Sequence, residues 1–195
     1  QFAIARLAAS SPKGYYLMVE GGRIDHGHHA SNPYRALSET QQFSQAIAAA
    51  LTQINLDETL VLVTADHSHV FTIAGYPTRG NPILGLAMGN DDQGNPTGKP
   101  ILDLDGTPYS TLGYQNGPGA ITTWPRPLPP ADPKAPQQAL VPTGDTFNGS
   151  ASPSETHGGD DVPLYAIGPN NGQVHGVIEQ NRIFDIIMNA MGKVG

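Results

Sequence analysis

A strand, a helix and a second strand follow one another near the start of the chain. Tyr15 to Val19 is a short apolar run that two glycines end, as in a buried strand. Asn32 and Pro33 are typical of a helix N-terminus, and apolar residues continue at helical spacing to about Asn55. Leu60 to Val63 is a second apolar run. This order predicts a βαβ unit, in which a right-handed crossover joins two parallel strands.

The middle of the chain differs in composition. Fourteen of the 18 prolines lie between Pro77 and Pro153, and the densest run, Trp124 to Pro136, favours extended polyproline II backbone. We therefore expect an α/β core over residues 1–71, an insertion over 72–152 and a return to the core over 153–195. The further elements that we expect are short strands at Lys99–Leu104, Ala120–Thr123 and Val162–Pro169 and a closing amphipathic helix at Val177–Met191.

Charge and composition exclude several classes of protein. The 195 residues carry a net charge of −7 and only ten Lys and Arg, so we expect no binding to nucleic acid. No apolar run approaches the roughly 20 residues that span a bilayer, so we expect no membrane span. The first residues, QFAIARLAASS, lack Met and a signal-peptide pattern, which indicates a processed, truncated or internally numbered chain. Without cysteine, a metal ion must be held by His, carboxylate or other oxygen ligands.

Six of the seven histidines lie in three short clusters that also contain acids. The clusters are Asp25 with His26, His28 and His29; Asp66 with His67 and His69; and His157 in ETHGGDD. Asp25 and His29 are four residues apart, so a helical turn would direct both toward one cation. The first two clusters follow the two predicted parallel strands, and ligands gather at such strand ends. Imidazole and carboxylate without thiolate favour a catalytic zinc site.

Each cluster also has a simpler interpretation when it is taken alone. The HGHH run is equally typical of a solvated surface patch, and Asp66 with His67 of a helix cap. His157 alone would be structural or exposed, and Glu20 an ordinary carboxylate at a strand end. A carboxylate such as Glu20 suits a hard ion, magnesium, better than zinc. The joint pattern of three clusters favours metal binding.

Four stretches carry a resemblance to a known family. VEGGRIDHGHHA (19–30), LVTADHSHVF (62–71), GYPTRGNPILGLA (75–87) and ETHGGDDVPLYAIGP (155–169) closely resemble the C-terminal half of alkaline phosphatases, especially the animal-type sequences. VHGVIEQN (174–181) agrees with the segment before the family's last helix. The resemblance fades within residues 90–150. It implies an α/β fold whose partial core is a parallel-sheet, three-layer, alkaline-phosphatase-like core. The Pro- and Gly-rich segment then corresponds to a crown-like insertion at a dimer interface.

The resemblance also implies a role for individual residues. It implies a first zinc on Asp25, His29 and His157, a second zinc on Asp66 and His67, a magnesium ion on Glu20, and contact of His26 with phosphate through water. His28 and His69 resemble residues that surround the ligands, and we expect them to orient the ligands as supporting residues do in metal sites. The cofactors implied are thus two zinc ions and one magnesium ion.

The same resemblance implies an activity and partners. The family hydrolyses phosphate monoesters by a two-zinc mechanism with a serine nucleophile in an Asp-Ser-Ala context, and no such context occurs here. We therefore expect no catalytic nucleophile in this chain, the N-terminal half of the same protein as partner, a homodimer, and a periplasmic or extracellular location. The alternative is a zinc-binding fragment or module without catalysis. Another hydrolase of the superfamily, a phosphodiesterase or sulfatase, is a weaker third reading.

Overall fold

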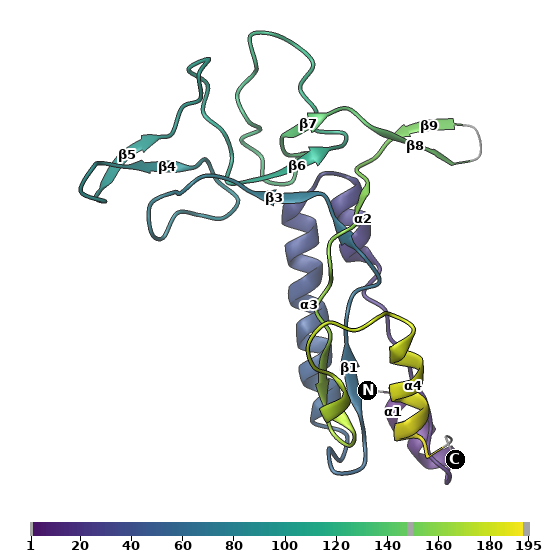
Figure 1. Ribbon diagram of the computed structural model, residues 1–195. Coiled ribbons are helices and arrows are strands. Elements are labelled where there is room, and N and C mark those ends of the chain that lie inside the picture. The colour runs from purple at the N-terminus through teal and green to yellow at the C-terminus, as the bar shows by residue number, and fades with distance from the viewer. Residues whose placement is uncertain (1, 148–149, 193–195) are drawn as a thin grey trace. The chain divides into compact units, whose positions relative to one another are not determined.

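The fold is taken from a computed structural model that describes residues 2–147 and 150–192 (Figure 1). The chain forms two compact units. Unit 1 comprises Gln1–Glu20, Gln42–His67 and Asp161–Gly195, and unit 2 comprises Gly21–Gln41 and Ser68–Asp160. The predicted division at residues 72 and 152 stays a prediction.

Unit 1 contains a two-stranded sheet and helices from both ends of the chain. Its strands β1 (Val61–Val63) and β11 (Tyr165–Ile167) pair antiparallel, with Val61 opposite Ile167. Its other elements are α1 (Phe2–Ser10), the C-terminal part of α3 (Pro33–Leu51), the 3₁₀ helix η1 (Asn171–Gln173) and α4 (Arg182–Ala190).

Most of the helices and strands predicted in unit 1 are present but shorter than predicted. The strands predicted at Leu60–Val63 and Val162–Pro169 are confirmed as β1 and β11, and the closing helix begins at Arg182. The strand predicted at Tyr15–Val19 is wrong, because within the described residues no strand hydrogen-bonds to this segment. An apolar run becomes a strand only where a neighbour takes its N–H and C=O groups. The predicted βαβ unit therefore does not form between Tyr15–Val19 and Leu60–Val63.

The predicted helix behind Asn32 is confirmed as α3. Pro33 is its first residue, and the Asn32 side-chain oxygen accepts the N–H of Arg35 at 2.9 Å, as an N-cap does. The helix ends at Leu51, four residues before the predicted end at Asn55.

Unit 2 contains a short helix and several small sheets. The helix α2 (Arg23–His29) precedes α3. The central sheet has the order β3-β6-β7, in which β6 pairs antiparallel with β3 and parallel with β7 (Figure 1). The strands of unit 2 are β2 (Ser68–His69), β3 (Phe71–Ile73), β4 (Met88–Asn90), β5 (Pro96–Pro100), β6 (Leu112–Asn116), β7 (Ala139–Val141), β8 (Gly144–Phe147), β9 (Ser150–Pro153) and β10 (His157–Gly158).

Of the two strands predicted inside the proline-rich segment, one forms in part and the other does not form. The one at Lys99–Leu104 overlaps β5 only at its first two residues, and Leu102 makes an isolated bridge to Pro108. The one at Ala120–Thr123 is wrong, because only Ala120 forms a bridge, to Ala139. β7 is the last strand of its sheet, and among the described residues only Ala120 of this segment pairs with its outer edge.

The core of unit 2 is formed by α3, β6, β7 and the residue directly before β4. The buried apolar residues there are Ala36, Ala87, Leu112, Tyr114 and Ala139. Gly27 lies in α2, where an added Cβ would stand 2.7 Å from the backbone nitrogen of Ala36 in α3. The two helix backbones thus approach more closely than any residue with a side chain permits.

We expect Gly27→Ala to lower the free energy of unfolding by about 1–3 kcal/mol, the usual cost of overpacking a core. By helix propensity alone, alanine would stabilise α2 by about 1 kcal/mol relative to glycine. A decrease in the free energy of unfolding would therefore come from the steric clash. Chemical denaturation measures the change. Gly159→Ala is the control, because no atom lies within 4 Å of its added Cβ. Equal stability of the two variants would contradict the close helix contact.

Among the described residues, no helix has both the length and the apolar character needed to cross a bilayer.

Candidate metal centre

The helix α2 places the first two predicted ligands on one face. Asp25 and His29 lie one turn apart, and the Oδ1 atom of Asp25 is 3.2 Å from the Nε2 atom of His29. The predicted helical turn therefore exists and directs both side chains the same way. Pro33 begins the next helix directly beyond, so α2 is short.

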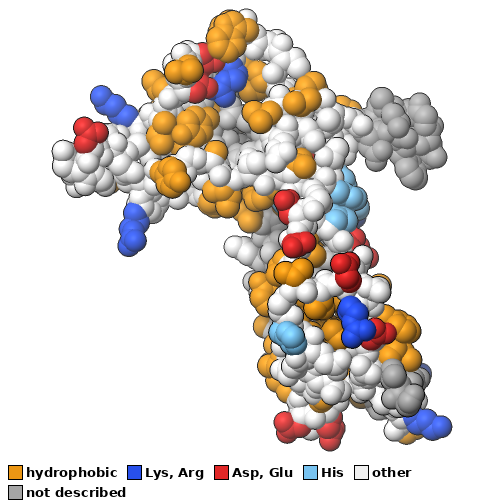
Figure 2. All heavy atoms as spheres, viewed as in Figure 1, with side chains coloured by type: hydrophobic (Ala, Val, Ile, Leu, Met, Phe, Trp, Pro, Cys, Tyr) orange, Lys and Arg blue, Asp and Glu red, His pale blue; other side chains and the backbone are white. Residues whose placement is uncertain are grey.

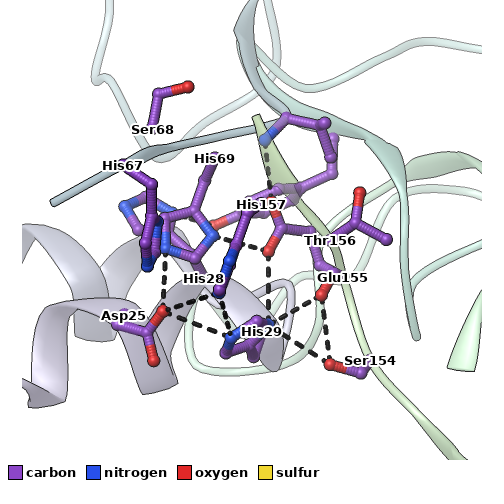
Figure 3. A network of polar contacts seen from close by, with 12 residues as sticks. Asp25, His28, His29, His67, Ser68, His69, Ser154, Glu155, Thr156 and His157 are labelled. Carbon is purple, nitrogen blue, oxygen red and sulfur yellow. Dashed lines mark hydrogen bonds and ion pairs between the residues drawn. The ribbon is translucent and has the colours of Figure 1, made fainter. Parts of the chain in front are cut away.

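The third predicted ligand comes from the far end of unit 2. The strand β10 pairs with β2, so that His157 stands opposite His69. The Nε2 atom of His157 is 3.5 Å from Asp25 Oδ1 and 3.2 Å from His29 Nε2 (Figure 3). The structure thus brings together residues that lie 132 positions apart in the sequence. We name Asp25, His29 and His157 the triad site.

The distances between the three ligand atoms of the triad site fit a tetrahedrally coordinated cation. Zinc bonds to nitrogen and oxygen of about 2.0–2.1 Å place neighbouring ligand atoms about 3.3 Å apart in a tetrahedron. The three separations here, 3.2, 3.5 and 3.2 Å, agree with that edge. The His157 side chain is 52% exposed, so the site is open on one side, as catalytic zinc sites are.

The ring of His29 is oriented by a main-chain carbonyl. Its Nδ1 atom lies 2.7 Å from the carbonyl oxygen of Glu155, and the Ser154 hydroxyl lies 3.2 Å from the same nitrogen. A carbonyl oxygen only accepts, so Nδ1 is the donor in this contact. Nε2 is therefore the nitrogen that faces Asp25 and His157, the orientation that a metal ligand requires.

His28 and His69, which we expected to orient the ligands, lie next to the triad site. His28 Nδ1 lies 3.0 Å from the hydroxyl of the buried Tyr114, and the His28 ring stacks on His69 with 4.5 Å between centroids. Burial, followed by the charge of His69, lowers the pKa of His28 to about 4, while burial raises the pKa of Tyr114. A neutral His28 and a protonated Tyr114 therefore form this contact near neutral pH. His69 Nε2 lies 3.1 Å from Asp25 Oδ1.

Glu155 is a site residue that we did not predict. Its side chain is fully buried, and its carboxylate lies 2.7 Å from His69 Nδ1. The signal was its place two residues before His157 in ETHGGDD, an acid beside a predicted ligand. Burial of a carboxylate cannot be read from sequence, because Glu is typically a surface residue.

The remaining predicted site residues are His26, Asp66, His67 and Glu20. His26 is exposed on α2. Asp66, His67 and Glu20 belong to unit 1, where His67 Nε2 lies 3.5 Å from Asp66 Oδ2 and the Asp66 side chain is 85% exposed. Their assignment to a second zinc and to magnesium stays a prediction.

Comparison with known proteins gives the family to which this chain belongs. A sequence model of the alkaline phosphatase family matches residues 1–193. The tissue-nonspecific alkaline phosphatase of Felis catus is 40% identical over 183 residues, which are 91% of this chain and 31% of that protein. The Rattus norvegicus isozyme is 41% identical over 182 residues, with the same coverage. The alkaline phosphatase of Gadus morhua is 39% identical over 187 residues, which are 91% of this chain and 34% of that protein.

The chain belongs to the alkaline phosphatase family, as the four sequence stretches indicated, and it has that family's fold with mixed α and β content. It spans about a third of the length of the curated relatives that it matches.

Proposed function

We propose that this chain is the C-terminal, metal-ligand part of an alkaline phosphatase that hydrolyses phosphate monoesters. The observation that carries the proposal is the triad site, whose three ligand atoms lie 3.2–3.5 Å apart in a chain of this family. Two zinc ions, when bound, would supply the charge that stabilises the attacking and leaving oxygens of an in-line displacement.

The residues of the chain have distinct tasks in this proposal. Asp25, His29 and His157 hold the first zinc, Asp66 and His67 hold the second, and Glu20 holds magnesium. The exposure of His157 leaves the substrate side of the triad site open. His26, next to Asp25, contacts the phosphate through a water molecule. The serine nucleophile lies outside this chain, since the sequence has no Asp-Ser-Ala context.

The surface of unit 1 supports a second polypeptide segment as partner. The sheet β1–β11 has only two strands, which are marginally stable on their own. Large apolar side chains in the unit are 58–88% exposed: Tyr16, Met18, Val19, Tyr165, Val177 and Phe184. Figure 2 shows apolar side chains on the visible surface. Large apolar side chains that are this exposed are typical of a surface that another segment covers. We propose that the N-terminal half of the protein covers this surface and completes a parallel-sheet, three-layer core.

The test is to reunite the chain with its N-terminal half and to supply zinc and magnesium. We expect hydrolysis of a simple aryl phosphate, loss of that activity when a chelator removes the metals, and its return when zinc is added back. A reunited protein that holds both metals but releases no phosphate would reject the proposal.

The alternative function is zinc binding without catalysis, which the missing nucleophile favours. It predicts stoichiometric zinc binding and no phosphate release, whether or not the N-terminal half is present. The reunited protein therefore distinguishes the two functions. We also propose that residues 72–152 form a crown-like insertion at a homodimer interface and that the protein is periplasmic or extracellular, both by analogy with the family.

A further inference from the structure

One buried carboxylate next to the triad site is not among its ligands. Glu155 is 1% exposed, and it lies two residues before His157. A buried carboxylate is costly unless every oxygen has a partner. The hydrogen-bond partners of Glu155 therefore indicate its structural role.

Both carboxylate oxygens of Glu155 accept hydrogen bonds from the segment that carries β2. The Oε1 atom accepts the N–H of Val70 at 2.8 Å, and the Oε2 atom lies 2.7 Å from His69 Nδ1. An ionised carboxylate only accepts, so Nδ1 of His69 is the donor. This contact turns the opposite edge of the ring, Nε2, toward Asp25 Oδ1 at 3.1 Å (Figure 3).

The main chain of Glu155 holds the other side of the triad site. Its N–H donates to the carbonyl oxygen of His29 at 3.0 Å, and its own carbonyl oxygen lies 2.7 Å from His29 Nδ1. One residue therefore contacts both rings at their Nδ1 atoms. Both rings consequently present Nε2 to Asp25, at 3.2 Å from His29 and 3.1 Å from His69.

A second geometry would use Glu155 as a ligand itself, since His29, His69 and Glu155 form another acid-histidine group. The contacts disfavour it. Nδ1 of His29 is already engaged by a carbonyl oxygen, and the 2.7 Å between His69 Nδ1 and Glu155 Oε2 is shorter than the roughly 3.3 Å edge of a tetrahedral zinc site. That distance is typical of a charge-assisted hydrogen bond.

We propose that Glu155 is a positioning residue for the triad site. Its carboxylate orients His69, so that Nε2 of this ring lies against the Asp25 carboxylate at 3.1 Å, and its carbonyl oxygen orients the His29 ligand. The proposal deepens the metal-binding part of the proposed function and rests on it. Carboxylates that hold histidines in this way typically change metal affinity by about 10–100-fold when they are replaced.

The variant that tests the proposal is Glu155→Gln. Glutamine has the same shape but only one acceptor oxygen, whereas Val70 N–H and His69 Nδ1–H are both donors. One donor must then face the amide NH₂ group, and since the main-chain N–H of Val70 cannot turn or lose its proton, we expect the His69 ring to turn or to change its protonated nitrogen. We expect the zinc affinity of the full chain to fall about 10–100-fold, measured by competition with a chelating dye. Glu179→Gln, an exposed site with the same loss of charge, is the control and should keep the parent affinity.

A second measurement separates positioning from general structural support. In the zinc-free parent, ¹H–¹⁵N NMR of the imidazoles should show a proton on Nδ1 of both His29 and His69. In Glu155→Gln the His69 signals should change, while Nδ1 of His29 should stay protonated, because its nearest acceptor is the main-chain carbonyl at 2.7 Å and the Glu155 carboxylate is farther away, at 3.6 Å. A parent His69 without a proton on Nδ1 would overturn the proposal, even if the variant does not fold.

The outcomes also separate this proposal from the proposed function. A parent chain that binds no zinc rejects the proposed metal centre. A parent that binds zinc, together with a Glu155→Gln variant of equal affinity and unchanged His69 signals, rejects only the positioning role.

Discussion

Replacement of Asp25 by alanine is expected to lower the zinc affinity of the triad site by more than about 100-fold. Asp25 supplies its only anionic ligand, and its Oδ1 atom lies 3.2 and 3.5 Å from the two histidine nitrogens. Without it, two imidazole ligands remain, which are too few to hold the ion and include no carboxylate. Replacement of residues that merely support a ligand already costs about 10–100-fold, so loss of the ligand itself should exceed that range.

Metal analysis after dialysis against a chelating dye measures this effect. We expect Asp25→Ala to retain one zinc fewer than the parent, and His157→Ala to empty the same site while the Asp66–His67 site stays nearly intact. Asp66→Ala should instead affect the other zinc. Asp92→Ala is the matched control, because Asp92 is an exposed acid in the turn between β4 and β5. Equal metal content in Asp25→Ala and Asp92→Ala would refute the assignment.

The second large effect is expected at Gly168, which follows β11 in unit 1. Its φ of +107° is a backbone conformation that residues with a side chain rarely adopt, and an added Cβ would lie 2.1 Å from the carbonyl oxygen of Thr59. The strain costs about 1–3 kcal/mol and the overpacking about as much again. Since Thr59 lies just before β1, relief of the clash would pull the two strands apart. We expect Gly168→Ala to lower the free energy of unfolding by about 2–6 kcal/mol.

Chemical denaturation of the full chain measures this loss. Gly172→Ala is the control, four residues further along, because nothing lies within 4 Å of its added Cβ and its φ is not in the left-handed region. A Gly168→Ala variant as stable as the Gly172→Ala variant would show that the β1–β11 pair tolerates a side chain there.

Local patterns predicted α3, α4 and part of the site, whereas α1 was not predicted. The Asn32 cap and the apolar spacing behind it place α3, because capping and periodicity act within a few residues. The four-residue spacing of Asp25 and His29 likewise suffices to bring their ligand atoms to 3.2 Å once α2 forms. The pattern of acids and histidines alone also favours metal ligands.

The sequence by itself thus determined where α3 and α4 run and which acids and histidines are candidate metal ligands. Only the tertiary structure decided that Val61–Val63 pairs antiparallel with Tyr165–Ile167, that Tyr15–Val19 is not a strand, and that Glu155 is buried behind the ligands. The physical reason is the range of the interactions. Helices and turns form from neighbours along the chain, whereas strand partners, burial and the choice of protonated imidazole nitrogen depend on groups roughly 100 residues away, whose approach no local pattern specifies.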